Sequence, residues 1–185
     1  MHWCGATSED FGRVTVADRR HAAVNPHAWF YQRPVTLAEH QASRWIAEPL
    51  RLLDCCQESD GAVAVVVTSL DRARDRPHPP AVIRAAAQGA GADQFTMTSY
   101  YRDDLTGLPE ARHFIADGAI EIAGALPVNP HGGQLGEAYI HGMNGIAEAV
   151  RQIRGTAVSQ VPGDGPVLVT AGTGVPTSGL ILGAD

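Results

Sequence analysis

The sequence predicts an α/β fold in layers, with sheets packed on buried helices. A valine-rich run, Gly61–Ser69, has the length and composition of a strand buried on both faces. Downstream, apolar residues recur at helical spacing from Leu135, and strand-like runs follow near the carboxyl end. Strand and helix segments in alternation are typical of layered α/β proteins, so we expect that class.

The first element is a predicted helix over Thr7–Ala28. It opens with the capping sequence TSED, in which Asp10 complements the helix dipole, and it ends near Asn25 and Pro26. The stretch Pro34–Leu53 has apolar residues at helical spacing, but Pro49 interrupts them. We expect a surface loop with short helical pieces there.

The middle of the chain holds two predicted strands and a connector. After the strand Gly61–Ser69, the arginine- and proline-rich segment Leu70–Pro80 predicts a connector, and Ala81–Ala87 predicts a second strand. Ile115–Ile122 predicts a weak hairpin around Asp117 and Gly118.

The carboxyl-terminal part begins with a predicted helix from Leu135 to Ile153. Gly155 stands where a helix cap belongs. Two short runs then predict strands, Val167–Ala171 and Gly179–Leu182, joined as a hairpin by GTGVPTS.

The composition excludes several classes of function. The net charge of -6 gives the chain no reason to bind nucleic acid or anionic lipid. The longest apolar run, Ala62–Val67, is too short to span a bilayer, and the amino end MHWCGATSED lacks the features of a signal peptide. We therefore expect a cytoplasmic chain with neither a nucleic acid nor a membrane as partner.

The cysteines and the basic residues restrict the chemistry further. Cys4, Cys55 and Cys56 fit neither a disulfide framework nor the spacing of a zinc site, and the histidines form no metal-binding motif. We expect no metal. Every basic residue is arginine, so Schiff-base and P-loop mechanisms that need lysine are excluded for this chain acting alone.

The segment Asn129–Gly133 places a proline and paired glycines directly before the predicted helix. Such a turn lets backbone N–H groups approach a ligand, and the helix amino end favours developing negative charge. A plain glycine turn explains the same pattern equally well. The candidate substrate-binding residues are Asn129, Gly132, Gly133 and, in the later GTG segment, Gly172 and Gly174.

Two residues are candidates for catalysis, Tyr139 and His131. Tyr139 lies on the apolar stripe of the predicted helix, where a phenol near the positive end of the dipole suits a general acid or base, although a packed core residue is the commoner outcome. His131, in the glycine turn, is better placed to face a cavity than His141, which we expect to be structural. Glu137 is explained by the helix dipole.

The sequence resembles the thiolase superfamily over nearly its whole length. The segments that carry the resemblance are SEDFGRVTVADRRHAAVNPHA, PLRLLDCCQESDGAVAVVVTS, LPVNPHGGQLGEAYIHGMNGIAEAVRQIRG and VLVTAGTG. They are similar to lipid-transfer-protein-like thiolases, and among them to the steroid side-chain aldolases of actinobacteria. The resemblance implies a partial thiolase-like layered fold and an acyl-CoA substrate, with no other cofactor.

The resemblance also implies a reaction. Tyr139 occupies the position of the catalytic histidine of thiolases, and Ala171 that of a catalytic cysteine, so the machinery for Claisen condensation is missing here. In the aldolase branch the tyrosine of GEAY handles a proton during retro-aldol cleavage of a steroid β-hydroxyacyl-CoA to a ketosteroid and propionyl-CoA. Oriented donors of the glycine turn, with His131, would hold the thioester oxygen.

The organisation that follows from the resemblance is incomplete. Residues 1–75 correspond to the end of the amino-terminal thiolase half, and residues 76–185 to the carboxyl-terminal half with an apparent deletion near 110–111. Relatives act with a partner that combines an OB fold and a zinc ribbon, so we expect such a partner, together with homodimerisation inside a heterotetramer. The enzyme is then active only with the missing segments and that partner.

Two other functions remain open. One is a non-catalytic thiolase-like subunit that binds acyl-CoA or lipid, or scaffolds a complex. The other is a thiolase of the acetyl-CoA acyltransferase type, which requires a nucleophilic cysteine.

Overall fold

The computed structural model describes residues 5–89, 111–171 and 177–185. Contacts divide the chain into two units that alternate along the sequence. Unit 1 consists of Met1–Val63, Gly107–Asn144 and Ala157–Pro162, and unit 2 of Ala64–Thr106, Gly145–Thr156 and Gly163–Asp185. The predicted division at residues 75 and 76 stays a prediction, because these units follow contacts and not chain order.

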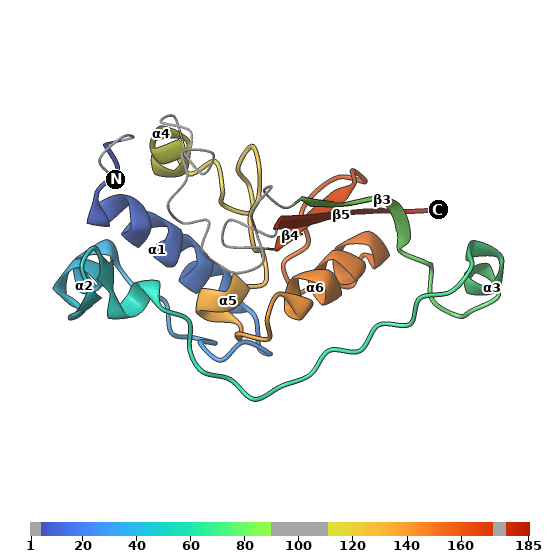
Figure 1. Ribbon diagram of the computed structural model, residues 1–185, viewed down its shortest axis with the longest axis horizontal. Helices are drawn as coiled ribbons and strands as arrows, with labels where there is room; N and C mark the ends of the chain where they lie inside the picture. The colour runs from blue at the N-terminus through green and yellow to red at the C-terminus, as the bar shows by residue number, and fades with distance from the viewer. Residues whose placement is uncertain (1–4, 90–110, 172–176) are drawn as a thin grey trace. The chain divides into compact units, whose positions relative to one another are not determined.

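Unit 1 is organised around a long helix, α1 (Ser8–Val24) (Figure 1). The Asp10 carboxylate accepts hydrogen bonds from the Thr7 N–H at 2.7 Å and the Thr7 hydroxyl at 2.9 Å. The helix ends at Val24, and its cap residue Asn25 is extended and precedes Pro26. The predicted amino-terminal helix is confirmed.

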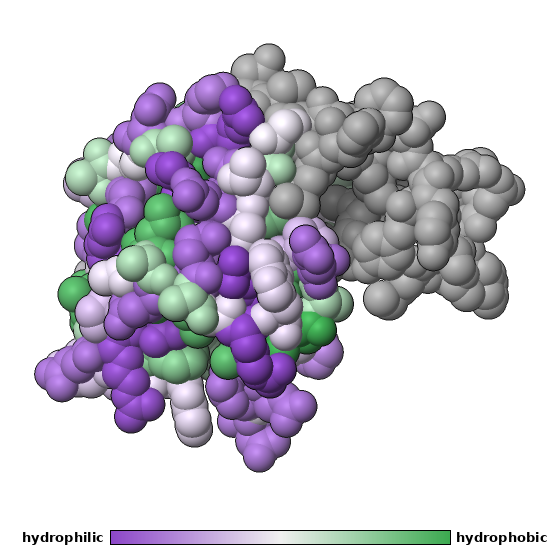
Figure 2. Space-filling model, turned by 90° about the vertical axis from the view of Figure 1, so that its left-hand side faces the viewer, coloured by the Kyte–Doolittle hydropathy of each residue, from purple (hydrophilic) through white to green (hydrophobic). Residues whose placement is uncertain are grey.

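Four short helices pack against α1. They are α2 (Leu37–Ala42), the 3-10 helix η1 (Leu52–Asp54), α4 (Ala111–Ala116) and α5 (Gly133–Gly136). Between α2 and η1, β1 (Trp45–Ala47) and β2 (Leu50–Arg51) form an antiparallel pair. The predicted loop with helical pieces over Pro34–Leu53 is confirmed for α2 and η1, but it missed the short hairpin of β1 and β2. On the side that Figure 2 presents, hydrophilic residues are interspersed with apolar ones.

A buried histidine–aspartate pair ties α2 to η1. His40 Nε2 lies 2.6 Å from Asp54 Oδ1, and both side chains are almost fully buried. Thr15 of α1 donates to the Leu53 carbonyl at 3.2 Å. Gly12 of α1 lets the His40 ring lie close to the helix, because a Cβ at position 12 would lie 2.7 Å from that ring.

Unit 2 contains a three-stranded antiparallel sheet of β3 (Val82–Gly89), β5 (Thr177–Gly183) and β4 (Val167–Ala171), in that order. Leu180 of β5 pairs with Ala86 on one side and with Val169 on the other. The predicted strands at Ala81–Ala87, Val167–Ala171 and Gly179–Leu182 are confirmed, as is the pairing of the last two.

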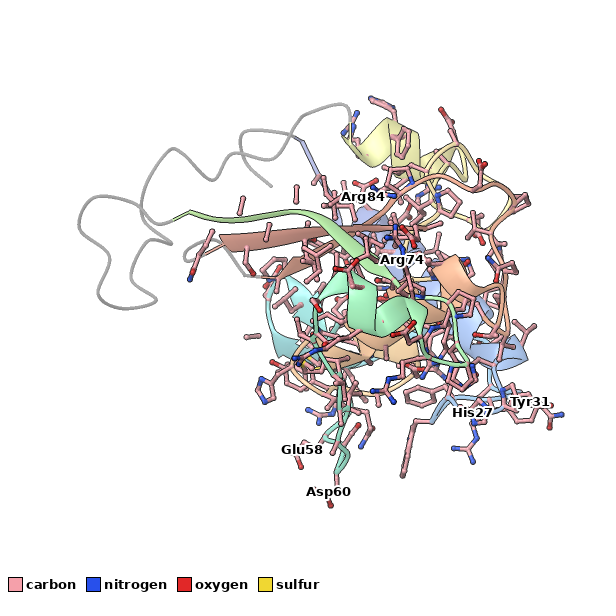
Figure 3. The ribbon with its side chains drawn as sticks, turned by 90° about the vertical axis from the view of Figure 1, so that its right-hand side faces the viewer. His27, Tyr31, Glu58, Asp60, Arg74 and Arg84 are labelled. Carbon is pink, nitrogen blue, oxygen red and sulfur yellow. The ribbon has the colours of Figure 1, made fainter. Side chains whose placement is uncertain are left out.

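Two helices complete the description of unit 2. The short α3 (Leu70–Arg74) lies within the predicted connector, and its Arg74 guanidinium binds both carboxylate oxygens of Asp185, at 2.6 and 2.7 Å (Figure 3). Arg84 donates to the Ala184 carbonyl. The helix α6 (Met143–Arg154) crosses the border between the units at Asn144 and Gly145, and Gly155 caps it with a φ of 67°.

The prediction of a buried strand at Gly61–Ser69 is wrong. This segment has no regular secondary structure, and the side chains of Val66 and Val67 are 93% and 74% exposed. A strand needs a neighbour to pair its backbone groups, and none pairs with this run among the described residues. The composition of the run predicts a strand, but it does not show whether another segment is available to pair with it.

Two other predicted elements are also wrong. The expected hairpin at Ile115–Ile122 is instead the end of α4 followed by turns. The expected continuous helix from Leu135 is interrupted: α5 ends at Gly136, and α6 begins only at Met143. Positive φ angles at His141 (45°) and Gly142 (83°) break the helical path between them.

None of the helices in the described part of the chain combines the length and the apolar character that crossing a membrane requires.

Candidate active site

The candidate site is built on the turn Asn129–Gly136 of unit 1. Three of its residues have positive φ angles: Asn129 at 49°, Gly132 at 108° and Gly133 at 58°. Asparagine and glycine are the residues that adopt this region at least cost. The Gly132 N–H donates to the Asn129 carbonyl at 2.8 Å, which closes the turn.

The glycines let this turn lie directly against α1. A Cβ on Gly132 would lie 2.6 Å from the Ala22 Cβ, and a Cβ on Gly136 would lie 2.6 Å from the same atom and 2.8 Å from the Asp18 carbonyl oxygen. Any side chain at these two positions would therefore force α1 and the turn apart. Close packing accounts for both glycines, and the role of Gly132 in substrate binding stays a prediction.

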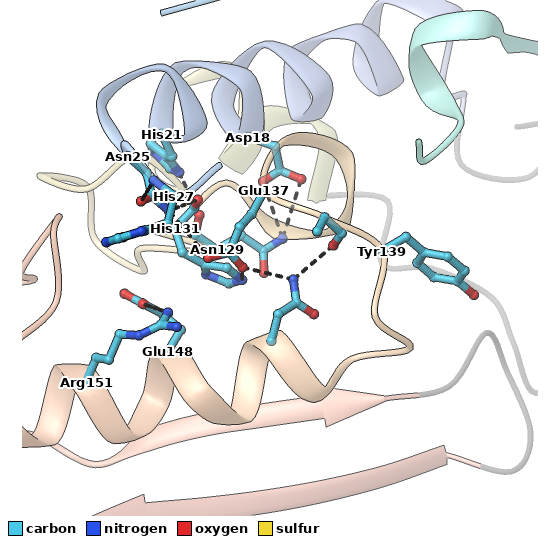
Figure 4. Close-up of polar contacts among 12 residues, drawn as sticks. Asp18, His21, Asn25, His27, Asn129, His131, Glu137, Tyr139, Glu148 and Arg151 are labelled. Carbon is cyan, nitrogen blue, oxygen red and sulfur yellow. Dashed lines mark hydrogen bonds and ion pairs between the residues drawn. The ribbon is translucent and has the colours of Figure 1, made fainter. Parts of the chain in front are cut away.

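One face of α1 holds the turn by polar contacts (Figure 4). The Asn129 side-chain amide donates to the Asp18 carboxylate, at 3.3 Å to Oδ1 and 3.5 Å to Oδ2. His21 Nδ1 lies 3.1 Å from the Asn129 carbonyl oxygen. Just past the end of α1, the Asn25 amide donates to the His131 carbonyl at 3.0 Å.

Glu137 is the centre of a second group of contacts. Its carboxylate accepts from the Asn144 amide at 3.1 Å and from the Asn25 amide at 3.4 Å, and His131 Nε2 lies 3.6 Å away. All four side chains are buried. Glu137 is thus a hydrogen-bonded interior carboxylate, a role that the helix dipole alone did not predict.

Burial changes the acidity of Asp18. Desolvation raises the pKa of this carboxyl group to about 7, and the hydrogen bond from Asn129 opposes that shift in part. The carboxyl group of Asp18 therefore changes its charge near neutral pH.

Tyr139 lies on an irregular segment between α5 and α6, so the predicted helical position for it is wrong. Its N–H donates to the Ser59 hydroxyl at 3.3 Å, and its half-buried ring lies beside the His141 ring with centroids 4.7 Å apart. In Figure 4 the Tyr139 hydroxyl points away from the His131 and Glu137 cluster.

The structure brings together part of the predicted site. Asn129, His131, Gly132 and Gly133 lie in one turn, and Tyr139 follows it in sequence but faces another direction. Gly172 and Gly174 lie outside the described residues. Within the described ranges, no group of three or more histidine, cysteine, aspartate or glutamate residues is arranged to hold a metal ion.

Sequence reasoning missed Asp18, His21 and Asn25. Their spacing of three and then four residues places them on one face of the predicted helix, and this was the available signal. A polar face on an otherwise well-predicted helix indicates a buried polar partner, and the glycine turn is that partner.

Comparison with known proteins identifies related chains. Residues 88–183 match the family described as thiolase C-terminal domain-like. The chain is 60% identical to the steroid side-chain-cleaving aldolase of Thermomonospora curvata, over 100% of this chain and 59% of that protein. It is 58% identical to the 17-hydroxy-3-oxo-4-pregnene-20-carboxyl-CoA lyase of Mycobacterium tuberculosis, over 99% of this chain and 59% of that protein.

A solved structure is similar over the whole chain. The Ltp2-ChsH2(DUF35) aldolase superposes with a TM-score of 0.95 at 58% identity, covering 100% of this chain and 60% of that one. The predicted thiolase-like layered fold is therefore confirmed. The chain spans about three fifths of the length of these relatives.

Proposed function

The chain belongs to the thiolase family, and from this premise we propose that it is part of an acyl-CoA carbon–carbon lyase. The proposed reaction is the retro-aldol cleavage of a steroid β-hydroxyacyl-CoA to a ketosteroid and propionyl-CoA. The observation that carries the proposal is the identity of 60% and 58%, across essentially all of this chain, to an aldolase and a lyase named for such substrates.

The proposed chemistry is a proton transfer coupled to the breaking of a carbon–carbon bond. A base takes the proton of the tertiary hydroxyl group, the oxygen becomes a ketone, and the electron pair of the broken bond moves to the thioester α-carbon. The resulting enolate then takes a proton to give propionyl-CoA. A single tyrosine side chain completes the cycle: as the phenolate it accepts the hydroxyl proton, and as the resulting phenol it returns that proton to the enolate carbon. We assign this role to Tyr139.

The turn Asn129–Gly133 is the proposed place for the thioester oxygen. The Gly132 N–H already donates to the Asn129 carbonyl, so we do not assign it as the main donor to the thioester oxygen. The proposed contributions to holding that oxygen are the shape of the turn and the His131 side chain. The substrate is itself the coenzyme A thioester, and we propose no further cofactor. Fixed polar groups around a developing enolate lower its energy because they need no reorganisation during the reaction.

We also propose a partner subunit. The similar solved structure is of an aldolase whose name joins Ltp2 to ChsH2(DUF35). By that analogy, the chain works with an OB-fold and zinc-ribbon protein, and it forms a homodimer within a heterotetramer.

One observation favours a second function, that of a non-catalytic acyl-CoA- or lipid-binding subunit. The Tyr139 hydroxyl points away from the buried cluster around His131, so the two proposed catalytic groups do not face each other. In this alternative the assembled protein binds acyl-CoA without cleaving it.

The test compares Tyr139→Phe with the wild-type chain, each purified with its candidate partner. We expect ketosteroid release to fall by on the order of 100-fold or more, the usual contribution of a general acid or base. Tyr31→Phe is the matched control, because Tyr31 is an exposed tyrosine on a different segment. Calorimetry of acyl-CoA binding accompanies each assay.

The outcomes separate the two functions. An unchanged rate in Tyr139→Phe removes Tyr139 from the mechanism. Tight acyl-CoA binding with no turnover in the wild-type complex supports the binding subunit.

A further inference from the structure

Asn129 is held at both its side chain and its main chain by α1. A non-glycine residue at a φ of 49° is in a conformation that costs on the order of 1 kcal/mol, so it persists only when its surroundings fix it. Asp18 accepts from the Asn129 amide, and His21 contacts the Asn129 carbonyl oxygen. Both contacts come from a helix that precedes the turn by more than a hundred residues.

His21 links this turn to charges near the surface. Its ring is 1% exposed, with Nδ1 at 3.1 Å from the Asn129 carbonyl and Nε2 at 3.3 Å from Glu121 Oε2. The Glu121 carboxylate is in turn bound by the Arg20 guanidinium. The imidazole therefore lies between the Asn129 carbonyl and the Glu121 carboxylate, and its hydrogen-bonding contact is the one on the Nδ1 side, to Asn129.

The far end of the same segment is fixed as well. Trp29 N–H donates to the Glu137 carbonyl at 2.8 Å, and Asn25 contacts the Glu137 carboxylate. Glu137 stands two residues before Tyr139. The segment from Asn129 to Glu137 leads to Tyr139, the proposed catalytic residue. Its first residue is held by α1, and its last residue is held by Asn25 and Trp29, which follow α1.

We propose that Asp18 is a positioning residue, which acts through Asn129 to hold the turn that leads to Tyr139. The inference rests on the proposed lyase function for its catalytic consequence. The pairing has a chemical direction: the Asp18 carboxylate only accepts, and the Asn129 amide supplies the donor. Exchanging the two residue types keeps one donor and one acceptor, which makes the proposal testable by a swap.

The experiment compares four versions of the chain in complex with the partner: wild type, Asn129→Asp, the double variant Asp18→Asn with Asn129→Asp, and Asn129→Asp with Asp54→Asn. The assay is run at about pH 8.5, above the pKa of about 7 of the Asp18 carboxyl group, so that Asn129→Asp places two carboxylates against each other. We expect kcat to fall by on the order of tenfold or more, with KM within about twofold. The swap Asp18→Asn with Asn129→Asp restores kcat to within about threefold of the wild type.

The variant with Asp54→Asn is the matched control. Asp54 is also a buried aspartate of unit 1, but the groups that its carboxylate binds are His40, Thr15 and the Arg51 N–H. We expect the added Asp54→Asn substitution to leave the kcat of Asn129→Asp as low as before. Rescue by both second substitutions, or by neither, overturns the proposal; rescue by neither indicates that Asn129 acts on the substrate directly.

Hydrogen exchange makes the test independent of activity. We expect the amides of residues 129–137 to exchange faster in Asn129→Asp and to regain their protection in the swap variant. If the wild-type complex has no cleavage activity, the proposed function fails, and exchange alone decides the positioning role. Equal protection in all four proteins overturns it.

Discussion

At the scale of single residues, Asp18 makes stability depend on pH in an unusual direction. Its carboxyl group has a pKa of about 7 in the folded chain, against an ordinary value of 3.8, because burial disfavours the charged form. Between about pH 4 and pH 7 the folded chain therefore keeps a proton that the unfolded chain has lost. Stability from this group falls as pH rises through that window.

We expect Asp18→Asn to remove this dependence. An amide at position 18 carries no charge to bury, yet its oxygen can still accept from Asn129. The free energy of unfolding, measured with urea, should be higher for the variant than for the wild type by a few kcal/mol at pH 8, and this difference should shrink towards pH 4. Glu9→Gln, on an exposed part of the same helix, is the control. A difference that stays constant between pH 4 and pH 8 would contradict the prediction.

The same scale shows which site residues the sequence could predict. The motif around Asn129–Gly133 identified the turn, since proline and paired glycines are readable signals. The direction of the Tyr139 hydroxyl was not readable, because it depends on the break at His141 and Gly142. Asp18 was not found because its only sign was its place on a helix face, and the meaning of that face depends on a partner far along the chain.

At the scale of elements, the end of α6 offers a clean test of backbone strain. Gly155 has a φ of 67°, and a Cβ there would meet no atom of the described residues within 4 Å. A side chain at this position costs only the left-handed conformation, with no clash added. We expect Gly155→Ala to lower the free energy of unfolding by about 1 kcal/mol.

The matched control for Gly155→Ala is Gly165→Ala. Gly165 also has open space around its Cβ position, but it has no positive φ. Substitution there should be neutral or slightly stabilising, because alanine reduces the freedom of the unfolded chain. Equal changes in the free energy of unfolding in the two variants would contradict the prediction, because the left-handed conformation at Gly155 would then carry no cost for alanine.

Elements differ in how far local sequence determines them. The strands β4 and β5 lie close in sequence and pair with each other, so composition and a turn signal were enough to predict them. The run Gly61–Ser69 has an equally strong strand composition, but it stays unpaired among the described residues. A strand is a property of two segments, and a sequence pattern reports only one of them.

At the scale of the whole molecule, the unpaired run Gly61–Ser69 favours self-association. The chain matches about three fifths of the length of its relatives, and a contiguous valine segment stands exposed at its surface. An exposed apolar segment with free backbone groups is a template for pairing between chains. The net charge of -6 opposes association but is spread over the whole chain.

We therefore expect Val66→Lys to reduce self-association without changing the thermal midpoint. Val66 is 93% exposed, so a lysine there loses no packing, while its charge interrupts the apolar run. Val24→Lys is the matched control, because Val24 is 56% exposed but stands alone at the end of α1. Sedimentation velocity over a range of concentrations should show weaker association in Val66→Lys alone. If Val66→Lys instead lowers the thermal midpoint by several degrees, the run is packed in solution and is not the associating segment.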